Sequence, residues 1–130
     1  MKVSGNFEVK LNPLDFYAQG LDGVNLGRMS IDKQFKGALE ATSKGEMLSA
    51  MTTVKGSAGY VAIEQVSGAL SGKNGSFVLQ HFGTMSRGSD RLVLEVVPDS
   101  GSGELSSLAG KMAIRIEGGK HWYEFEYELA

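Results

Sequence analysis

The sequence predicts an all-β protein: a single eight-stranded antiparallel β-barrel with little or no helix, over residues 1–130. Apolar and polar residues alternate along most of the chain, which is typical of strands that have one face in a core. Short polar runs interrupt this alternation at regular spacing, as turns do in all-β folds. Glycine is frequent, at 18 of 130 residues, and proline is rare, at 2, which favours a strongly curved sheet with many turns and bends.

The first half of the chain predicts long strands. Residues 2–11 alternate, and Asn12-Pro13 is expected to end this strand because proline cannot donate to a ladder. A second alternating segment covers residues 26–43, and Lys44-Gly45 is expected to turn it into residues 46–54. One face of the second segment carries its apolar residues, which are Met29, Ile31, Phe35, Leu39 and Ala41.

The second half predicts strands over residues 59–70, 76–85 and 90–97, before a closing hairpin. Asn74-Gly75 lies between the first two of these strands, and this dipeptide is a strong hairpin signal. Serial short turns favour an up-and-down barrel, which leaves no sheet edge exposed. A two-sheet sandwich is the alternative.

The closing hairpin fixes its own register. If Gly118-Gly119 is a two-residue turn, Ile116 lies opposite His121 and alternation assigns every neighbour. The face that bears His121 then holds Met112, Ile114, Ile116, Tyr123, Phe125 and Tyr127. The other face carries Glu124 and Glu126, so we expect the aromatic face to line the interior.

Residues 59–70 and 76–85 are apolar on both faces, so their orientation stays open. One shared face carries Tyr60, Ala62, Glu64, Val66, Phe77, Leu79 and His81. The opposite face carries Val61, Ile63, Val78 and Phe82. Whichever face lies outside leaves exposed apolar sheet, which predicts a subunit interface and a homo-oligomer, either a dimer or a trimer.

Six side chains are candidate ligand contacts if the first of these faces lines the interior. They are Tyr60, Glu64, His81, His121, Tyr123 and Tyr127. Glu64 and His81 are also the candidate catalytic pair, because a carboxylate can orient an imidazole for acid–base chemistry. The alternative is that the histidines are satisfied core residues and that Glu64 is solvated. No spacing specifies a metal and no motif specifies a cofactor, so we expect neither.

The composition restricts the partners and the location. A net charge of -2 and a pI near 5.7 argue against a nucleic-acid partner, which selects for a basic face. The chain has no cysteine, which excludes a disulfide framework and fits the cytoplasm. No apolar run is long enough for a signal peptide or a membrane span, so no membrane partner is expected.

Several segments resemble one known family. Residues 97–105, 108–110, 76–81 and 35–40, together with the terminal strand, are similar to an uncharacterised bacterial domain-of-unknown-function family of small barrels. That family resembles the allene oxide cyclase fold, which plant dirigent proteins share. Gly101, Gly103 and Gly110 are similar in spacing to the bend that proteins of this fold place before a barrel strand. The resemblance implies a barrel, and relatives with known roles steer a reactive apolar molecule inside it.

The sequence leaves two functions open, because an eight-stranded barrel either fills with side chains or holds one small ligand. The first is a barrel that binds a small apolar molecule in its lumen, with isomerase-like or cyclase-like activity as its catalytic form. The second is a filled barrel that serves as an oligomerisation or protein-interaction module without catalysis. Whether the protein is an enzyme is not decided by its sequence.

Overall fold

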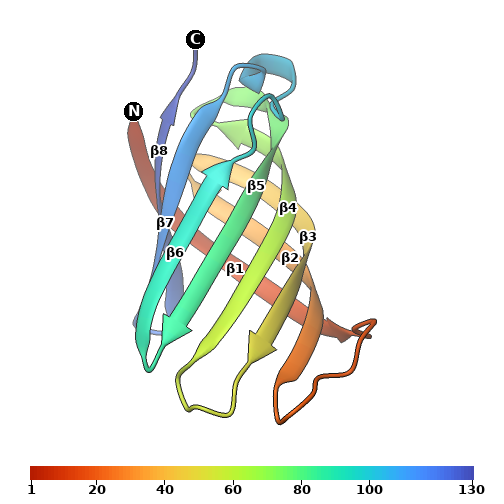
Figure 1. Cartoon of the computed structure of the whole chain (residues 1–130). Coiled ribbons are helices and arrows are strands. Elements are labelled where there is room, and N and C mark those ends of the chain that lie inside the picture. Colours follow the sequence, from red (N-terminus) through yellow and green to blue (C-terminus); the bar gives the residue numbers. More distant parts are fainter.

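The computed structural model describes residues 1–130 as one closed antiparallel barrel in the strand order β1 to β8 (Figure 1). The strands are β1 Lys2–Leu14, β2 Asn25–Gly37, β3 Leu39–Met51, β4 Ala58–Leu70, β5 Lys73–Ser86, β6 Ser89–Val96, β7 Ala109–Glu117 and β8 Lys120–Glu128. The predicted eight-stranded up-and-down barrel is therefore confirmed. The only helical element is a 3-10 turn, η1, at Gly103–Leu105, and no helix is long and apolar enough to cross a membrane.

Three of the hairpins turn on two residues that both have positive φ, which is the type I′ geometry that matches strand twist. These turns are Ser71-Gly72, Arg87-Gly88 and Gly118-Gly119. The last one confirms the register predicted for the closing hairpin, with Ile116 opposite His121.

Two predicted turns are wrong. Gly45 and Gly75 lie inside strands, where the lack of a side chain lets two segments of the chain come close together. Gly45 lies inside β3 opposite Glu64, and the chain reverses earlier, at Gly37 with φ 110°. Gly75 lies inside β5, after the two-residue turn that joins β4 to β5. A Cβ at Gly45 would collide with Glu64, and one at Gly75 would collide with the carbonyl of Ser102.

The first strand also departs from the sequence prediction, because β1 continues through Asn12-Pro13 to Leu14. β2 pairs with this part of β1, with Pro13 opposite Met29. β8, on the other side, pairs only with Lys2–Phe7. Beyond Phe7 the strand has a ladder on one side only, where a residue without an N–H is tolerated.

The two ends of the barrel differ. One end carries both chain termini and η1, and we call it the closed end (Figure 1). Its interior is packed with buried side chains, among them Leu39, Leu70, Phe77, Leu105, Leu108, Phe125 and Tyr127. The opposite end carries the connections over residues 15–24 and 52–57 and two of the tight turns. We call it the open end, because a cavity lies there.

The orientation of β4 and β5, which the sequence leaves open, follows from burial. Glu64 and His81 face inward, with 0% and 4% of their surface exposed. Val61, Ile63 and Phe82 lie on the outer surface and are 43–51% exposed. The polar candidates therefore lie inside the barrel, and an apolar sheet face lies outside.

Candidate functional site

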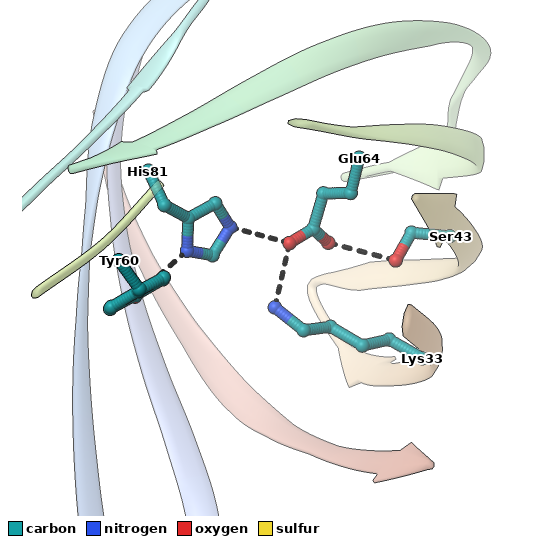
Figure 2. A network of polar contacts seen from close by, with 5 residues as sticks. All are labelled: Lys33, Ser43, Tyr60, Glu64 and His81. Atoms are coloured by element: carbon teal, nitrogen blue, oxygen red, sulfur yellow. Dashed lines mark hydrogen bonds and ion pairs between the residues drawn. The ribbon is translucent and has the colours of Figure 1, made fainter. Parts of the chain in front are cut away.

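A row of buried polar side chains lies inside the barrel between the packed core and the open end (Figure 2). Each of four consecutive strands contributes one of them: Lys33 from β2, Ser43 from β3, Glu64 from β4 and His81 from β5. All four are less than 9% exposed. Burying charged groups is costly unless they are paired, so their arrangement decides whether this row is stable.

The Glu64 carboxylate is the centre of the row. Lys33 Nζ donates to Oε2 at 2.8 Å, and Ser43 Oγ donates to Oε1 at 2.8 Å. His81 Nε2 lies 2.5 Å from Oε2, so both carboxylate oxygens are bonded. No buried side-chain nitrogen or oxygen in the structure lacks a partner. The network is therefore fully satisfied, as a stable buried polar cluster must be.

Opposing effects act on the pKa of Glu64. Burial by itself would raise that pKa, since it penalises the carboxylate. The hydrogen bond from His81 and the charge and hydrogen bond of Lys33 outweigh burial and lower the pKa to about 2. Lys33 also lies over the ring of Phe7, with Nζ 4.9 Å from the ring centroid, a cation–π contact. Glu64 is therefore a buried carboxylate at neutral pH, with Lys33 as its ion-pair partner.

Tyr60 connects this network to the open end, because its hydroxyl lies 3.2 Å from His81 Nδ1. A carboxylate only accepts hydrogen bonds, so the Nε2 of His81 that faces Glu64 carries a proton. In the neutral imidazole, Nδ1 is then the acceptor and Tyr60 is the donor. Burial and the nearby Glu64 charge raise the pKa of Tyr60, which keeps its hydroxyl protonated.

The cavity at the open end has a volume of about 760 Å³ and includes Tyr60 in its lining. Four of the six methionines of the chain line it, namely Met29, Met47, Met51 and Met85. Aliphatic side chains from β6 and β7 complete the apolar part of the lining: Leu92, Ile114 and Ile116. Thioether side chains are flexible and adapt to ligands of irregular shape. Polar and charged residues also border it, namely Ser49, Thr84, Asp90, Arg91 and Arg115. A largely apolar hollow with a few polar groups is the usual form of a small-molecule site.

Gly83 leaves the space that the ring of Tyr60 occupies. It lies on β5 directly opposite Tyr60, and a Cβ at this position would collide with the tyrosine ring. The ring therefore lies across β5 and brings its hydroxyl to His81. This places a tyrosine whose hydroxyl is bonded to the buried polar network in the wall of a largely apolar cavity.

Comparison with known proteins agrees with the barrel and gives its family. The sequence profile of DUF3224, described as a protein of unknown function, matches residues 3–127. The chain belongs to the DUF3224 family. The crystal structure of a DUF3224 protein of unknown function from Shewanella oneidensis MR-1 is 65% identical, with a TM-score of 0.98, and the match covers 100% of this chain and 97% of that one. A search of the curated proteins found no match.

The structure of this DUF3224 protein brings three of the six candidate ligand contacts together, namely Tyr60, Glu64 and His81. The other three lie elsewhere. His121 packs against Phe7, with ring centroids 5.1 Å apart, and is not part of the cavity wall. Tyr123 and Tyr127 are buried toward the closed end, where the Tyr127 hydroxyl donates to Ser71.

Sequence reasoning missed Lys33, Ser43 and the four cavity methionines. A signal for the first two was present. Lys33 lies between Ile31 and Phe35 in the alternation, so the period of two assigns it to the interior. Ser43 continues the inward series in the same way. Alternation also assigns the four methionines to the inward faces of their strands. It does not show that they surround one cavity, because only closure of the barrel brings residues of β2, β3 and β5 together there.

Proposed function

We propose that this protein binds a small, predominantly apolar molecule in the cavity at its open end. The observation that carries the proposal is the position of Tyr60, whose ring borders the cavity and whose hydroxyl is fixed by the His81–Glu64–Lys33 network. A site of this kind gains affinity from apolar contact and selectivity from its few polar groups. The proposal also places the protein in the cytoplasm, because a chain without cysteine fits a reducing compartment.

The hydrogen-bond pattern supports a class of ligand. When Tyr60 donates its proton to Nδ1 of His81, its oxygen keeps lone pairs that can accept another hydrogen bond. A ligand that donates from a hydroxyl group can use this oxygen without breaking the network. An apolar alcohol or phenol therefore fits the site better than a hydrocarbon of the same shape.

A catalytic form of this proposal needs Tyr60 as well. Glu64 and His81 are at most 4% exposed, so a proton that moves between the network and a ligand has to pass through the Tyr60 hydroxyl. Isomerase-like or cyclase-like chemistry on an apolar compound is compatible with this arrangement. We include such chemistry in the proposal, together with a likeness of this barrel to the allene oxide cyclase barrels. Both would use the same cavity.

The proposal is tested by measuring binding of 1-hexanol by calorimetry. We expect saturable binding to the wild-type protein and an affinity about fivefold lower for Tyr60→Phe, since a neutral hydrogen bond contributes about 1 kcal/mol. Tyr17→Phe, at a fully exposed position in the connection between β1 and β2, is the matched control and should bind normally. Mass spectrometry of solvent extracts of the purified protein should also find a hydroxylated apolar compound. No saturable binding and no extracted compound would refute the proposal.

The outer face of the barrel supports a second function, association with a second copy of the chain. Leu48, Val61 and Phe82 form a row across β3, β4 and β5 and are 43–47% exposed. Arg28 and Glu46 border this row and form an ion pair of 2.6 Å, so each copy would bring both charges to the contact. A dimer or trimer by light scattering, converted to a monomer by Val61→Asp, is the expected result. A wild-type monomer at working concentration would contradict it.

A further inference from the structure

The wall of the barrel has a weakly paired seam between β6 and β7. β6 pairs with β5 along its whole length, and β7 pairs with β8 along its whole length. Between β6 and β7, only Glu95 and Lys111 are paired. From this pair toward the open end, the facing edges of the two strands have no ladder partner, so the wall is not sealed by hydrogen bonds there.

Two hollows meet at this seam. The open-end cavity includes Leu92 of β6 and Ile114 of β7 in its lining. A groove of about 450 Å³ along the same two strands contains both of these residues, and it also contains Val93 and Ala113. Since the two hollows share Leu92 and Ile114, the apolar side chains at the seam border the cavity and the groove alike.

Tyr60 faces the start of this path. Its ring lies over Gly83, and Gly83 pairs with Leu92 on the next strand. The way from the ring to the seam therefore crosses β6 alone, a distance of one to two strand spacings of about 4.8 Å each. The inward residues along it are Gly83, Leu92 and Ile114. Charged residues lie beside the path: Arg91 and Arg115 also border the cavity, and Lys2, Glu95, Lys111, Glu124 and Glu126 border the groove.

We propose that the seam is a lateral binding channel and that the ligand is an elongated apolar alcohol. Its hydroxyl lies at Tyr60, and its chain passes between β6 and β7 into the outer groove. This inference rests on the proposed function and adds the shape of the ligand and the place of its chain. It predicts that closing the seam weakens the binding of long ligands and leaves the binding of short ligands unchanged.

A disulfide across the seam provides the test. Continuing the register from Glu95 and Lys111 would place Val93 opposite Ala113. A bridge in Val93→Cys/Ala113→Cys therefore requires the two unpaired strands to move together to the spacing of a disulfide, which closes the seam. The chain has no cysteine of its own, so the bridge is the only disulfide that forms. Calorimetry then compares 1-dodecanol, which is long enough to pass the seam, with 1-hexanol, which is not. We expect oxidation to weaken 1-dodecanol binding at least tenfold and to leave 1-hexanol binding unchanged, with recovery on reduction.

Two further variants complete the experiment. Thr42→Cys/Ser67→Cys bridges β3 and β4, which are already fully paired, and should affect neither alcohol. Ala113→Asp places a charge in the outer groove at an exposed position and should weaken 1-dodecanol only, without requiring a bridge to form. Unchanged 1-dodecanol binding in the oxidised and Ala113→Asp proteins would overturn the channel, while 1-hexanol binding would still support the cavity. If the wild-type protein binds neither alcohol, the channel and the proposed function both fall.

Discussion

Two inward tyrosines place their rings against a glycine, and the two cases have opposite consequences. Toward the closed end, Tyr123 lies against Gly5, and its hydroxyl accepts from the Leu39 N–H at 2.9 Å and donates to the Lys36 carbonyl at 3.0 Å. Those bonds are made to backbone and hold β8 to the β2–β3 turn. At the open end, Tyr60 lies against Gly83, but its hydroxyl bonds to the His81 side chain and borders a cavity.

The difference shows what makes an inward tyrosine structural or functional. Burial and aromatic character are shared, and burial raises the pKa of both hydroxyls. What differs is the partner of the hydroxyl and the space beside the ring. The Tyr123 hydroxyl has its proton and one lone pair engaged by backbone and is buried where no ligand can reach it, whereas the Tyr60 hydroxyl is bonded to a single side chain beside a cavity and can bind a ligand.

The largest expected effect concerns packing at the closed end. Phe125 is 0% exposed and stacks on Phe77 with ring centroids 5.9 Å apart. Phe125→Ala should lower the free energy of unfolding by about 4 kcal/mol, measured by urea denaturation. Met51→Ala in the cavity wall, at a residue that is 59% exposed, should change it by less than about 0.5 kcal/mol. Equal losses at the two ends would show that they do not differ in packing.

The next effect concerns the charge of Glu64. Because folding lowers its pKa from 4.5 to about 2, ionised Glu64 stabilises the fold above pH 4.5, and this contribution is lost as the pH falls toward 2. The shift corresponds to about 3 kcal/mol. Glu64→Gln should therefore be less stable than wild type by about that amount at pH 7, with the difference shrinking between pH 4.5 and 2.

Urea denaturation across this pH range measures both proteins. Glu46→Gln, at an exposed carboxylate paired with Arg28, should keep the acid-dependent loss of the wild type. A difference between wild type and Glu64→Gln that stays constant from pH 7 to pH 2 would contradict the role of the buried charge.

A smaller effect concerns the space beside the network. A Cβ at Gly45 would collide with the Ile63 carbonyl oxygen and lie 2.8 Å from the Cβ of Glu64, so Gly45→Ala should cost about 2 kcal/mol of stability by forcing β3 away from β4. Gly59→Ala is the matched control in β4, since its Cβ would only make an ordinary contact of 3.7 Å with the Gly83 carbonyl. Thermal denaturation of both variants distinguishes them, and equal melting temperatures would argue against a tight site around Glu64.

The smallest effect separates the two tyrosines directly. Tyr123→Phe leaves the Leu39 N–H without its acceptor and should cost about 1 kcal/mol of stability. Tyr60→Phe should cost less, because water in the open-end cavity can bond to His81 instead, and it should instead weaken ligand binding. If Tyr60→Phe proves the more destabilising of the two under urea denaturation, the assignment of structural and functional roles is reversed.

The parts of the fold that the sequence predicts are those in which one signal suffices. The Gly118-Gly119 turn and the alternation after it place His121, Tyr123 and Phe125 on the correct face and in the correct register. The parts it does not predict depend on contacts between distant segments. Gly45 and Gly75 have the composition of turns, and only the positions of Glu64 and Ser102 reveal that they allow close approach instead.

The candidate site is predictable in the same uneven way. Glu64, His81 and Tyr60 share a face by alternation, but both faces of β4 and β5 are apolar, so sequence alone could not turn that face inward. The Lys33 ammonium supplies the physical reason for the orientation. It neutralises Glu64 from β2, and a strand period of two would have placed it inside. The cavity depends on barrel closure and has no local signal in the chain.

The methyl NMR spectrum of the six methionines, recorded during titration with 1-hexanol, tests the central claim most directly. Met29, Met47, Met51 and Met85 line the open-end cavity, whereas Met112 is 5% exposed in the core and Met1 is 71% exposed at the chain start. Saturable shifts of the four cavity methyls, with Met1 and Met112 unchanged, are the predicted result. Shifts of no methyl, or equal shifts of all six, would contradict a ligand site at the open end.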